Sequence, residues 1–315
     1  MTGTPGERPS LAITIRSFAL DHAVRKDLES HFHICYTNTS GRRLPESELI
    51  DAIRNADAVI AGTEVFSRKV IDSSPRLKVI SRVGVGTDSI DLDAAAEKNI
   101  RVLITAASTI QPVAEHTLAL IFCVLKQIAE YHLAVKNNDH ATGQASLLQG
   151  KTVGIIGFGR IGSRTGELLS CLGCTVIFYD PFVPASPGPA FKKAGSLAEV
   201  LSQADIITLH VPARKGEKPL LDREAFNQCR KGVIIINTAR GSLVDEQALY
   251  EALKAGTVAG AGLDVTATDP YTGPLLSLPR VIITPHVASN TVESRKAMEH
   301  EAVENIMKGL LQGLS

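Results

Sequence analysis

Three closely spaced glycines follow an apolar run that starts at residue 152. Gly157, Gly159 and Gly162 form the pattern Gly-x-Gly-x-x-Gly, and a helical pattern begins after the first two. Gly157 would permit a tight turn, Gly159 would let the backbone approach a pyrophosphate, and Gly162 would let the helix pack against the strand. The free N–H groups at the start of that helix, together with its dipole, would face the phosphates.

An acidic residue completes this pattern. A second apolar run, residues 175–179, ends at Asp180, about twenty residues beyond the glycines. A carboxylate there can accept hydrogen bonds from both hydroxyls of an adenosine ribose, and it would repel a 2′-phosphate. The pattern predicts a dinucleotide site and favours NAD over NADP. The alternative is an ordinary glycine-rich turn between a strand and a helix.

Two further residues of catalytic type also follow apolar runs. Arg240 comes after residues 232–236, and a fixed guanidinium there could grip a carboxylate by two parallel hydrogen bonds. His286 follows residues 281–285, and an imidazole can give and take a proton at neutral pH. Ligands of open α/β sheets bind beyond the carboxyl ends of the strands, so both are candidates for substrate chemistry. A loop-capping arginine and a structural histidine are the alternatives.

Two carboxylates come between these residues in the chain. Asp264 ends another expected strand, and Asp269 follows it before a proline. A carboxylate beside His286 would orient the imidazole and raise its pKa by favouring the charged form. Asp269 by itself is equally well explained as a turn residue.

Other candidates are weaker. Gly84 and Gly86 follow an expected strand, and their loop could present N–H groups to an anion or could simply connect two elements. His116 has no acidic or metal-like partner in sequence and is expected to be structural, whereas His210 could line a cofactor site without reacting. The pair Cys171 and Cys174 lacks a second pair or a histidine cluster, so no metal site is expected.

Short apolar runs alternate with helical patterns almost throughout the chain, which predicts an α/β fold of parallel sheets with helices on both faces. One long, densely apolar helix is expected over residues 112–136, buried and packed against a second subunit, and a last helix over 291–311. The expected strands are residues 11–15, 33–36, 58–60, 77–81, 101–103, 152–156, 175–179, 206–209, 232–236, 260–264 and 281–284.

Two sheets in one chain require two linkers, which we place near Thr105 and Pro285. The sequence therefore predicts two Rossmann-like domains. Residues 1–104 and 286–315 would form a discontinuous substrate-binding domain, completed by the C-terminal helix, and residues 105–285 would form the NAD-binding domain. A cleft between domains is a normal place for a ligand.

Composition excludes several classes of protein. The 315 residues include 33 basic and 33 acidic side chains, which argues against non-specific binding of nucleic acid. The polar first ten residues carry no secretory signal, and the apolar segment 118–125 is too short to cross a bilayer, so no membrane association is expected. Five cysteines in a chain of this length favour a reducing compartment, and a cytoplasmic location is expected.

With these residues assembled, the chain resembles the D-2-hydroxyacid dehydrogenase family, near its phosphoglycerate dehydrogenase branch. The resemblance implies that Arg240 is the catalytic arginine, that His286 is the acid–base histidine, and that Asp264 contacts the nicotinamide carboxamide. Five segments carry it in order: 82–88, 113–117, 157–162, 237–241 with Val244 and Asp245, and 284–287.

The resemblance also defines full candidate sets. The catalytic residues would be Arg240, Asp269 and His286. Cofactor contacts are expected from Gly157, Phe158, Gly159, Arg160, Ile161, Gly162, Asp180, His210, Val211, Pro212, Thr238, Ala239 and Asp264. Substrate contacts are expected from Arg82, Val83, Gly84, Val85, Gly86 and Thr109.

The chain departs from the family pattern near the substrate. The family usually has Glu at the position of Asp269, and Asp is shorter by one methylene. The family often has Pro-Gly and an Asn where this chain has Ala106, Ala107 and Thr109. These differences leave the reaction class in place but weaken the assignment of one substrate.

The activity implied is reversible hydride transfer between NAD(H) and C2 of a small 2-hydroxy or 2-oxo acid. Separately, the long apolar helix suggests a homodimer. Arg82, Arg68 or Lys69 could reach a distal phosphate, which leaves 3-phosphoglycerate, hydroxypyruvate, glyoxylate and a phosphonate analogue open. An NAD(H)-sensing scaffold, similar to the corepressors that resemble this family, is the alternative. Formate-type oxidation is a third, for which an amide would be expected beside the histidine.

Overall fold

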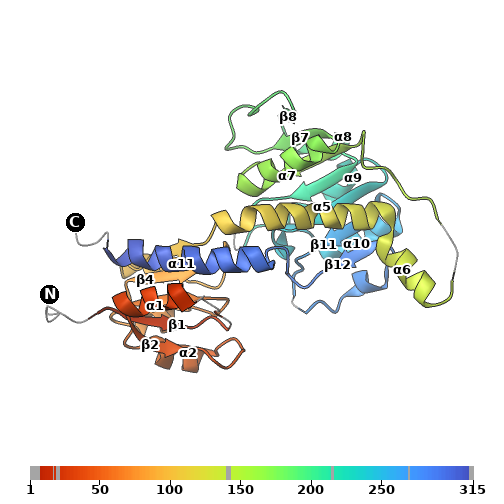
Figure 1. The fold of residues 1–315 in the computed structure, drawn as a ribbon. Coiled ribbons are helices and arrows are strands. Elements are labelled where there is room, and N and C mark those ends of the chain that lie inside the picture. Colours follow the sequence, from red (N-terminus) through yellow and green to blue (C-terminus); the bar gives the residue numbers. More distant parts are fainter. Residues whose placement is uncertain are drawn as a thin grey trace. The chain divides into compact units, whose positions relative to one another are not determined.

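The computed structural model describes residues 8–16, 18, 22–139, 143–213, 216–268 and 270–311. The chain forms two compact units (Figure 1), one of Met1–Thr109 with Thr291–Ser315 and one of Ile110–Asn290. Each is built on a parallel sheet with helices, which confirms the predicted fold class. The two boundaries lie five residues beyond the predicted linkers at 104/105 and 285/286.

The first unit has a five-stranded sheet in the order β2-β1-β3-β4-β5, one of the two common doubly wound orders. Its strands are β1 (Ser10–Ile13), β2 (His33–Thr37), β3 (Ala58–Ala61), β4 (Val79–Arg82) and β5 (Arg101–Ile104). Its helices are α1 (His22–His31), α2 (Glu46–Ile53), α3 (Arg68–Asp72), α4 (Leu92–Glu97), the 3-10 turn η1 (Ala107–Thr109) and α11 (Val292–Leu311).

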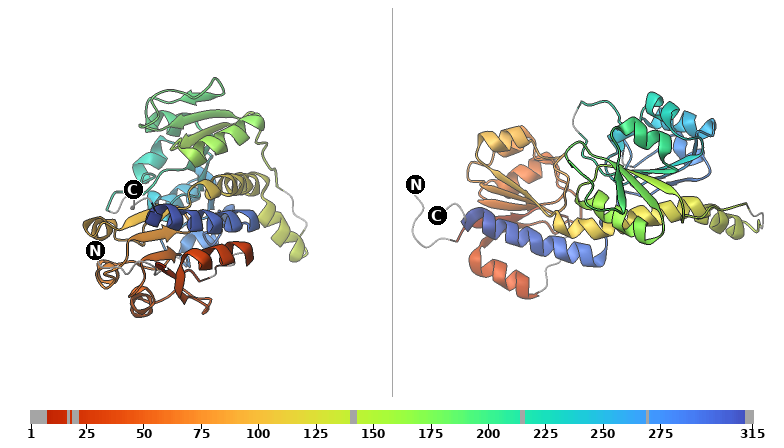
Figure 2. Two further views of the ribbon diagram at one scale, coloured as in Figure 1. Left: turned by 60° about the vertical axis from the view of Figure 1, so that its left-hand side comes forward. Right: turned by 90° about the horizontal axis from the view of Figure 1, so that it is seen from above.

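The C-terminal helix α11 returns to this unit and packs on β3, β4 and β5 (Figure 2). Its buried Met298, Ala302 and Ile306 share a core with strand residues, while α2, α3 and α4 enclose a second core. A Cβ at Gly309 would lie 2.9 Å from the side chain of Val79, so glycine permits this close approach. The unit is thus completed by a segment far away in sequence, as predicted.

The second unit has a seven-stranded parallel sheet in the order β12-β11-β10-β9-β6-β7-β8, the common Rossmann order extended by β12. Its strands are β6 (Thr152–Ile156), β7 (Thr175–Tyr179), β8 (Phe191–Lys193), β9 (Ile206–Leu209), β10 (Val233–Asn237), β11 (Val258–Leu263) and β12 (Val281–Ile283). Its helical segments are α5 (Ile110–Lys126), α6 (Ile128–Lys136), α7 (Arg160–Cys171), α8 (Leu197–Gln203), α9 (Arg223–Gln228), η2 (Gly241–Leu243), α10 (Glu246–Lys254) and η3 (Pro274–Ser277).

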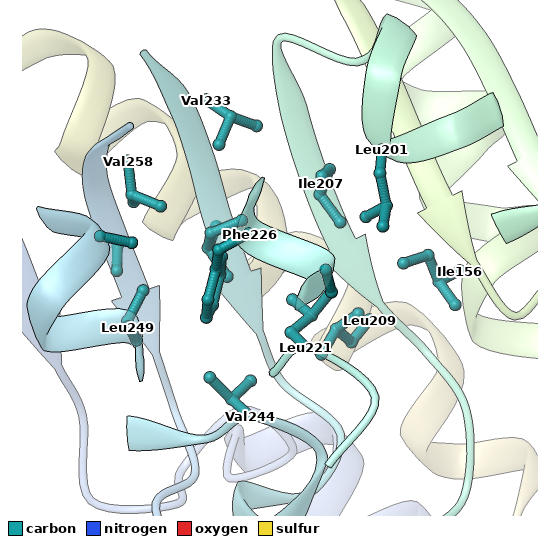
Figure 3. Packing of buried hydrophobic residues seen from close by; sticks show 14 of the residues in the cluster. Ile156, Leu201, Ile207, Leu209, Leu221, Phe226, Val233, Val244, Leu249 and Val258 are labelled. Carbon is teal, nitrogen blue, oxygen red and sulfur yellow. The ribbon is translucent and has the colours of Figure 1, made fainter. Parts of the chain in front are cut away.

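Helices cover both faces of this sheet. Leu201 of α8, Phe226 of α9 and Leu249 of α10 pack on one face with residues of β9 and β10 (Figure 3). Apolar residues of α5 and α7 pack on the other face. The inner strands β6, β9, β10 and β11 are buried almost throughout on both sides, which is why their sequences are largely apolar rather than alternating.

The single helix predicted over residues 112–136 is two helices. α5 and α6 meet at Gln127, whose φ of 52° lies in the left-handed region, so that prediction was wrong. The Gln127 side chain donates a hydrogen bond of 2.9 Å to the carbonyl of Gln144, which holds the break. Eight side chains of α5 are buried and none of α6, so only α5 belongs to the core.

The segment Ala107–Lys126 is long and apolar enough, by length and composition, to cross a membrane, with a mean hydropathy of 1.3. Residues 118–125, the apolar stretch predicted from the sequence, are therefore only part of a longer apolar segment. Half of the segment is buried inside the protein, and α5 packs on α7, β10 and β11. A helix enclosed by a core is expected to be apolar on most sides, so this packing accounts for its composition.

Candidate functional site

The glycine turn lies between β6 and β9, where the strand order of the second sheet reverses. Gly157 has a φ of 90°, and a Cβ on it would lie 2.5 Å from the carbonyl oxygen of His210. A Cβ on Gly162 would collide with the carbonyl of Gly157, so α7 packs directly against the turn. A Cβ on Gly159 would meet nothing within 4 Å in the described part of the chain. Two glycines therefore close the turn, and the third leaves room for a phosphate.

The start of α7 offers N–H groups to that space. α7 begins at Arg160 with Gly159 as its N-cap, and no side chain caps it. The first N–H groups of a helix need acceptors from outside it, and a phosphate is a suitable one. Arg160 and Gly159 are exposed, which fits the approach of an anion.

Asp180 follows β7 and is tied to the same turn. Its carboxylate accepts hydrogen bonds of 2.8 Å from the N–H groups of Phe158 and Phe182. The ring of Phe158 stacks on Phe178 in the core at a centroid distance of 3.9 Å, so only its backbone is left for a cofactor contact. Asp180 is half-buried, so part of the residue stays accessible to solvent beside the turn.

His210 follows β9 on the other side of the switch point. Burial lowers the pKa of His210 to about 3, so the ring is neutral at physiological pH. Its Nε2 lies 3.1 Å from the hydroxyl of Thr208. A neutral ring followed by Val211 and Pro212 can line a cofactor site, but it cannot supply a proton near neutral pH.

Arg240 is held by a loop that Asn237 shapes. The buried side-chain amide of Asn237 accepts from the N–H of Ala239 at 3.0 Å and donates to the carbonyl of Arg240 at 2.8 Å. The Nη1 of Arg240 donates to the carbonyl of Ala239 at 2.7 Å, and the residue is half-buried. A Cβ on Gly241 would collide with the backbone of Thr266, so glycine is required where this loop meets the one after β11.

His286 follows β12, and its backbone is unusual. Its φ is 53°, a left-handed conformation that is uncommon outside glycine. Its N–H donates to the carbonyls of Asp264 and Thr284, each at 2.9 Å. The residue is exposed. Such conformations persist where the surroundings impose them, and they concentrate at functional sites.

Asp264 imposes this conformation. Its side chain is buried and accepts from the hydroxyl of Thr284 at 2.6 Å and from the N–H groups of Val287 and Ala288 at 2.9 Å each. Burial alone would raise the pKa of Asp264, but hydrogen bonds from His116, Thr284 and the two N–H groups outweigh it and hold the pKa below its ordinary value. The carboxylate is therefore ionised and anchors residues 284–288.

In the first unit, two N–H groups of the loop after β4 already donate hydrogen bonds within the protein. Val83 donates to the carbonyl of Ala61 at 2.9 Å, and Gly84 donates to the hydroxyl of Thr105 at 2.6 Å. The N–H groups of Val85 and Gly86 have no acceptor within the described residues. Of the four residues Val83–Gly86 predicted to bind an anion, only Val85 and Gly86 therefore have N–H groups that are open to one.

These features agree with comparisons to known proteins. Residues 118–288 match the family described as D-isomer specific 2-hydroxyacid dehydrogenase, NAD binding domain. The chain belongs to this family. The second unit is accordingly its NAD-binding domain, and the open space at Gly159 and the acid at Asp180 fit that cofactor.

Several relatives of the chain are known. It is 36% identical over 269 residues to a D-3-phosphoglycerate dehydrogenase of Mycobacterium leprae, covering 84% of this chain and 51% of that protein. It is 35% identical over 278 residues to a hydroxypyruvate reductase of Thermotoga maritima, covering 86% of this chain and 90% of that protein. A glyoxylate reductase from Paecilomyes thermophila superimposes with a TM-score of 0.88 at 26% identity, covering 98% and 97% of the two chains. The chain thus spans about half the length of the phosphoglycerate dehydrogenases that it matches.

Some predicted dehydrogenase residues have other partners. Thr109 is buried, and its hydroxyl donates to the carbonyl of Ala106 at 3.1 Å, so the prediction that it contacts substrate finds no support in the first unit. Arg82 donates through Nε to the carbonyl of Gly86 at 3.0 Å and through Nη1 to that of Val83. Asp269 lies outside the described residues, so its place beside His286 stays a prediction.

Asp264 has a further partner, His116, that the sequence did not predict. His116 was expected to be structural because no acid accompanies it in sequence, yet its Nε2 lies 3.4 Å from the Asp264 carboxylate and 3.1 Å from the Thr284 hydroxyl. The one available signal was that His116 lies in a segment, 113–117, that the family shares. As to metals, no group of three or more His, Cys, Asp or Glu gathers within the described residues, and both Cys171 and Cys174 are free thiols.

Proposed function

We propose that the protein is an NAD-dependent oxidoreductase that interconverts small 2-hydroxy and 2-oxo acids by hydride transfer at C2. The observation that carries this proposal is the placement of Arg240 and His286 at the exits of β10 and β12. Both strands flank β11 in the sheet whose glycine turn fits a dinucleotide. Membership of the D-isomer specific family supports a product of the D configuration.

Arg240 would bind the substrate. Its guanidinium can hold a carboxylate by two parallel hydrogen bonds, and its charge would polarise the C2 carbonyl. The loop imposed by Asn237 keeps the guanidinium at the strand exit. In the first unit, the open N–H groups of Val85 and Gly86 are proposed to bind an anion.

His286 would carry the proton. When reduced NAD is bound, it supplies the hydride that C2 receives in the reductive direction. The protonated imidazole of His286 would donate its proton to the C2 oxygen, and in the oxidative direction the neutral ring would remove it. A positioned general acid of this kind accelerates a reaction by about 10²–10⁴-fold. We retain Asp269 as the residue proposed to stabilise the charged ring.

We further propose that the substrate carries no distal phosphate, as in hydroxypyruvate or glyoxylate. The basic residues that could have held a phosphate are engaged elsewhere in the first unit. Arg68 forms two hydrogen bonds with Glu97, at 2.6 and 3.0 Å, and Lys69 pairs with Glu46 at 2.7 Å. These pairs are exposed and individually weak, so the preference is a matter of degree.

The experiment is a panel of 2-oxo acids assayed by NADH absorbance, with hydroxypyruvate, glyoxylate and 3-phosphohydroxypyruvate as its core. Turnover supports the proposal, and a higher kcat/KM for the acids without phosphate supports the substrate class. NADH binding without turnover of any acid would instead support the scaffold. Turnover restricted to 3-phosphohydroxypyruvate would contradict the substrate class but not the reaction.

We also propose that the chain forms a homodimer through α6. Ile128, Leu133 and Val135 are 49%, 57% and 62% exposed, and Leu147 beyond α6 is 70% exposed. Ile128 and Val135 are seven residues apart and share one face of α6, and apolar side chains exposed together on one face mark protein–protein contacts more often than isolated ones do. Light scattering should give about twice the chain mass of 33.6 kDa, and the paired change Ile128→Asp and Val135→Asp should return it to that value. A monomeric wild type would refute the dimer.

A further inference from the structure

The helix α5 touches both strand exits that carry the proposed catalytic residues. His116 contacts Thr284 and Asp264, which hold the segment with His286. The next residue, Thr117, is 3.0 Å from the hydroxyl of Thr238, which stands two residues before Arg240. All of these residues belong to the second unit.

The donors and acceptors around His116 can be assigned by elimination. The hydroxyl of Thr284 has one proton, which it gives to the Asp264 carboxylate at 2.6 Å. Its oxygen must then accept from His116, whose Nε2 lies 3.1 Å away. His116 therefore carries a proton on Nε2, and the chain of donation runs from His116 to Thr284 to Asp264.

The same reasoning applies to the neighbouring contact. Thr117 gives its hydroxyl proton to the carbonyl of Val113 at 2.8 Å, so its oxygen must accept from Thr238. This contact is buried, and Thr117 is wholly inaccessible to solvent. α5 thus donates to the β12 exit through His116 and accepts from the β10 exit through Thr117.

The contact through His116 bears on the geometry of His286. Asp264 fixes the left-handed conformation of His286 because its backbone carbonyl accepts the N–H of His286 while its carboxylate accepts from Thr284, Val287 and Ala288. Without His116, the Thr284 oxygen would lose its donor, and the carboxylate would lose the nearest cationic or polar group on α5. The carboxylate and the threonine would then be free to rearrange.

We propose that His116 is a positioning residue of the hydride-transfer reaction, acting through Thr284 and Asp264 on the segment that carries His286. The inference rests on the proposed function of His286. His116 does not touch substrate in this role, so its effect should fall on kcat rather than on the binding of NADH.

The test compares His116→Leu, which removes the donor, with His116→Gln, whose side-chain amide can still donate to Thr284. The kcat for the preferred 2-oxo acid should fall by about 10–100-fold in His116→Leu, because displacements of about 1 Å at a reacting group cost rates of that order. The KM for the acid and the Kd for NADH should change less than about threefold. His116→Gln should recover kcat to within about threefold of wild type. NADH fluorescence reports binding cleanly, since the chain has no Trp.

Glu115→Gln is the matched control. Glu115 precedes His116 on α5 but is exposed and pairs only with Gln111 among the described residues, so this variant should behave as wild type. A His116→Leu variant with wild-type kcat would overturn the positioning role. So would equal losses of kcat in His116→Leu and His116→Gln, because the hydrogen bond would then not matter. A wild type that binds NADH but turns over no 2-oxo acid would overturn the proposed function itself, and the role of His116 with it.

Discussion

The carboxyl edges of the two sheets use their polar groups in opposite ways. At the second sheet, the groups around His286 are satisfied: Asp264 alone accepts from Thr284, Val287 and Ala288 through its side chain. At the first sheet, the loop after β4 fastens Val83 and Gly84 and leaves the next two N–H groups without an acceptor in the described chain. One edge holds the backbone segment that carries His286, and the other leaves N–H groups that we propose to bind an anion.

The difference follows from the chemistry assigned to each edge. Proton transfer needs an imidazole kept in one orientation, and a buried, ionised carboxylate can enforce the backbone on which it stands. Anion binding needs donors that the protein itself does not use. Changes at the second edge should therefore alter kcat, and changes at the first should alter the KM for the acid.

The largest effect is expected for His286→Asn. Loss of the proposed acid should lower kcat by about 10²–10⁴-fold while the Kd for NADH stays within about twofold. His33→Asn is the matched control, because His33 is an exposed histidine on β2. Steady-state kinetics and NADH fluorescence measure the two quantities. An unchanged kcat in His286→Asn would show that His286 is not the general acid.

The next largest effect is expected for Asp264→Asn. An amide in place of the carboxylate would turn one donor toward the N–H of Val287 or Ala288 and leave a buried donor unsatisfied, at a cost of about 1–3 kcal/mol in unfolding free energy. The kcat should fall about tenfold or more, since His286 loses its anchor. Urea unfolding and steady-state assays test both. Full stability and full activity in this variant would contradict the anchoring role.

The same variant should reveal a pH dependence. The folded-state pKa of Asp264 is below its ordinary value of 3.8, so the ionised form stabilises the folded state. That contribution is complete above pH 3.8 and is lost as the pH falls from there through the folded-state pKa. The difference in unfolding free energy between wild type and Asp264→Asn should therefore be constant near neutral pH and shrink below about pH 4. A difference that grows on acidification would reverse the assigned sign.

A smaller effect on cofactor choice is expected for Asp180→Ala. The Kd for NADH should rise about tenfold, equivalent to about 1.4 kcal/mol, and the preference for NADH over NADPH should weaken. The reason is that Ala lacks both the ribose acceptor and the charge that opposes a 2′-phosphate. Fluorescence titration with the two cofactors gives the ratio. An unchanged ratio would mean that Asp180 does not select the cofactor.

The smallest effect is expected at the first edge. Thr105→Val keeps the shape of the side chain but removes the acceptor for the Gly84 N–H, so the loop after β4 should lose its register. The KM for the 2-oxo acid should rise about threefold to tenfold with the NADH affinity unchanged. Thr105→Ser keeps the hydroxyl and should behave as wild type. A change in NADH affinity would break the contrast between the two edges.

Much of the fold could be predicted because the central parallel strands are buried on both faces. Residues 206–209 and 232–236 are almost entirely apolar, and they coincide with β9 and most of β10. The short edge strand β8 was not predicted, because an edge strand of three residues has little apolar pattern. The break at Gln127 was missed because the contact that holds it comes from Gln144, in a loop outside any pattern.

Site residues could be predicted only where a motif fixes both the residue type and the spacing. The glycines of the turn and the acid at Asp180 have defined spacings. The structure confirms the tight turn at Gly157 and the close packing of α7 at Gly162, whereas the contacts expected with a cofactor stay predictions. The pairing of His116 with Asp264 could not be predicted, since 148 residues separate the two and only the packing of α5 on β11 brings them together. The hydrogen bonds of the Val83 and Gly84 N–H groups could not be predicted either, because their acceptors, Ala61 and Thr105, come from neighbouring strands and their ends.

The central claim is that hydride reaches C2 of a 2-oxo acid bound at the exits of β10 and β12. Reduction of hydroxypyruvate with NADH that carries deuterium at both C4 positions, followed by mass and chiral analysis of the product, tests it most directly. We expect one deuterium at C2 of a product with the D configuration. A product without deuterium at C2, or one with the L configuration, would contradict the account.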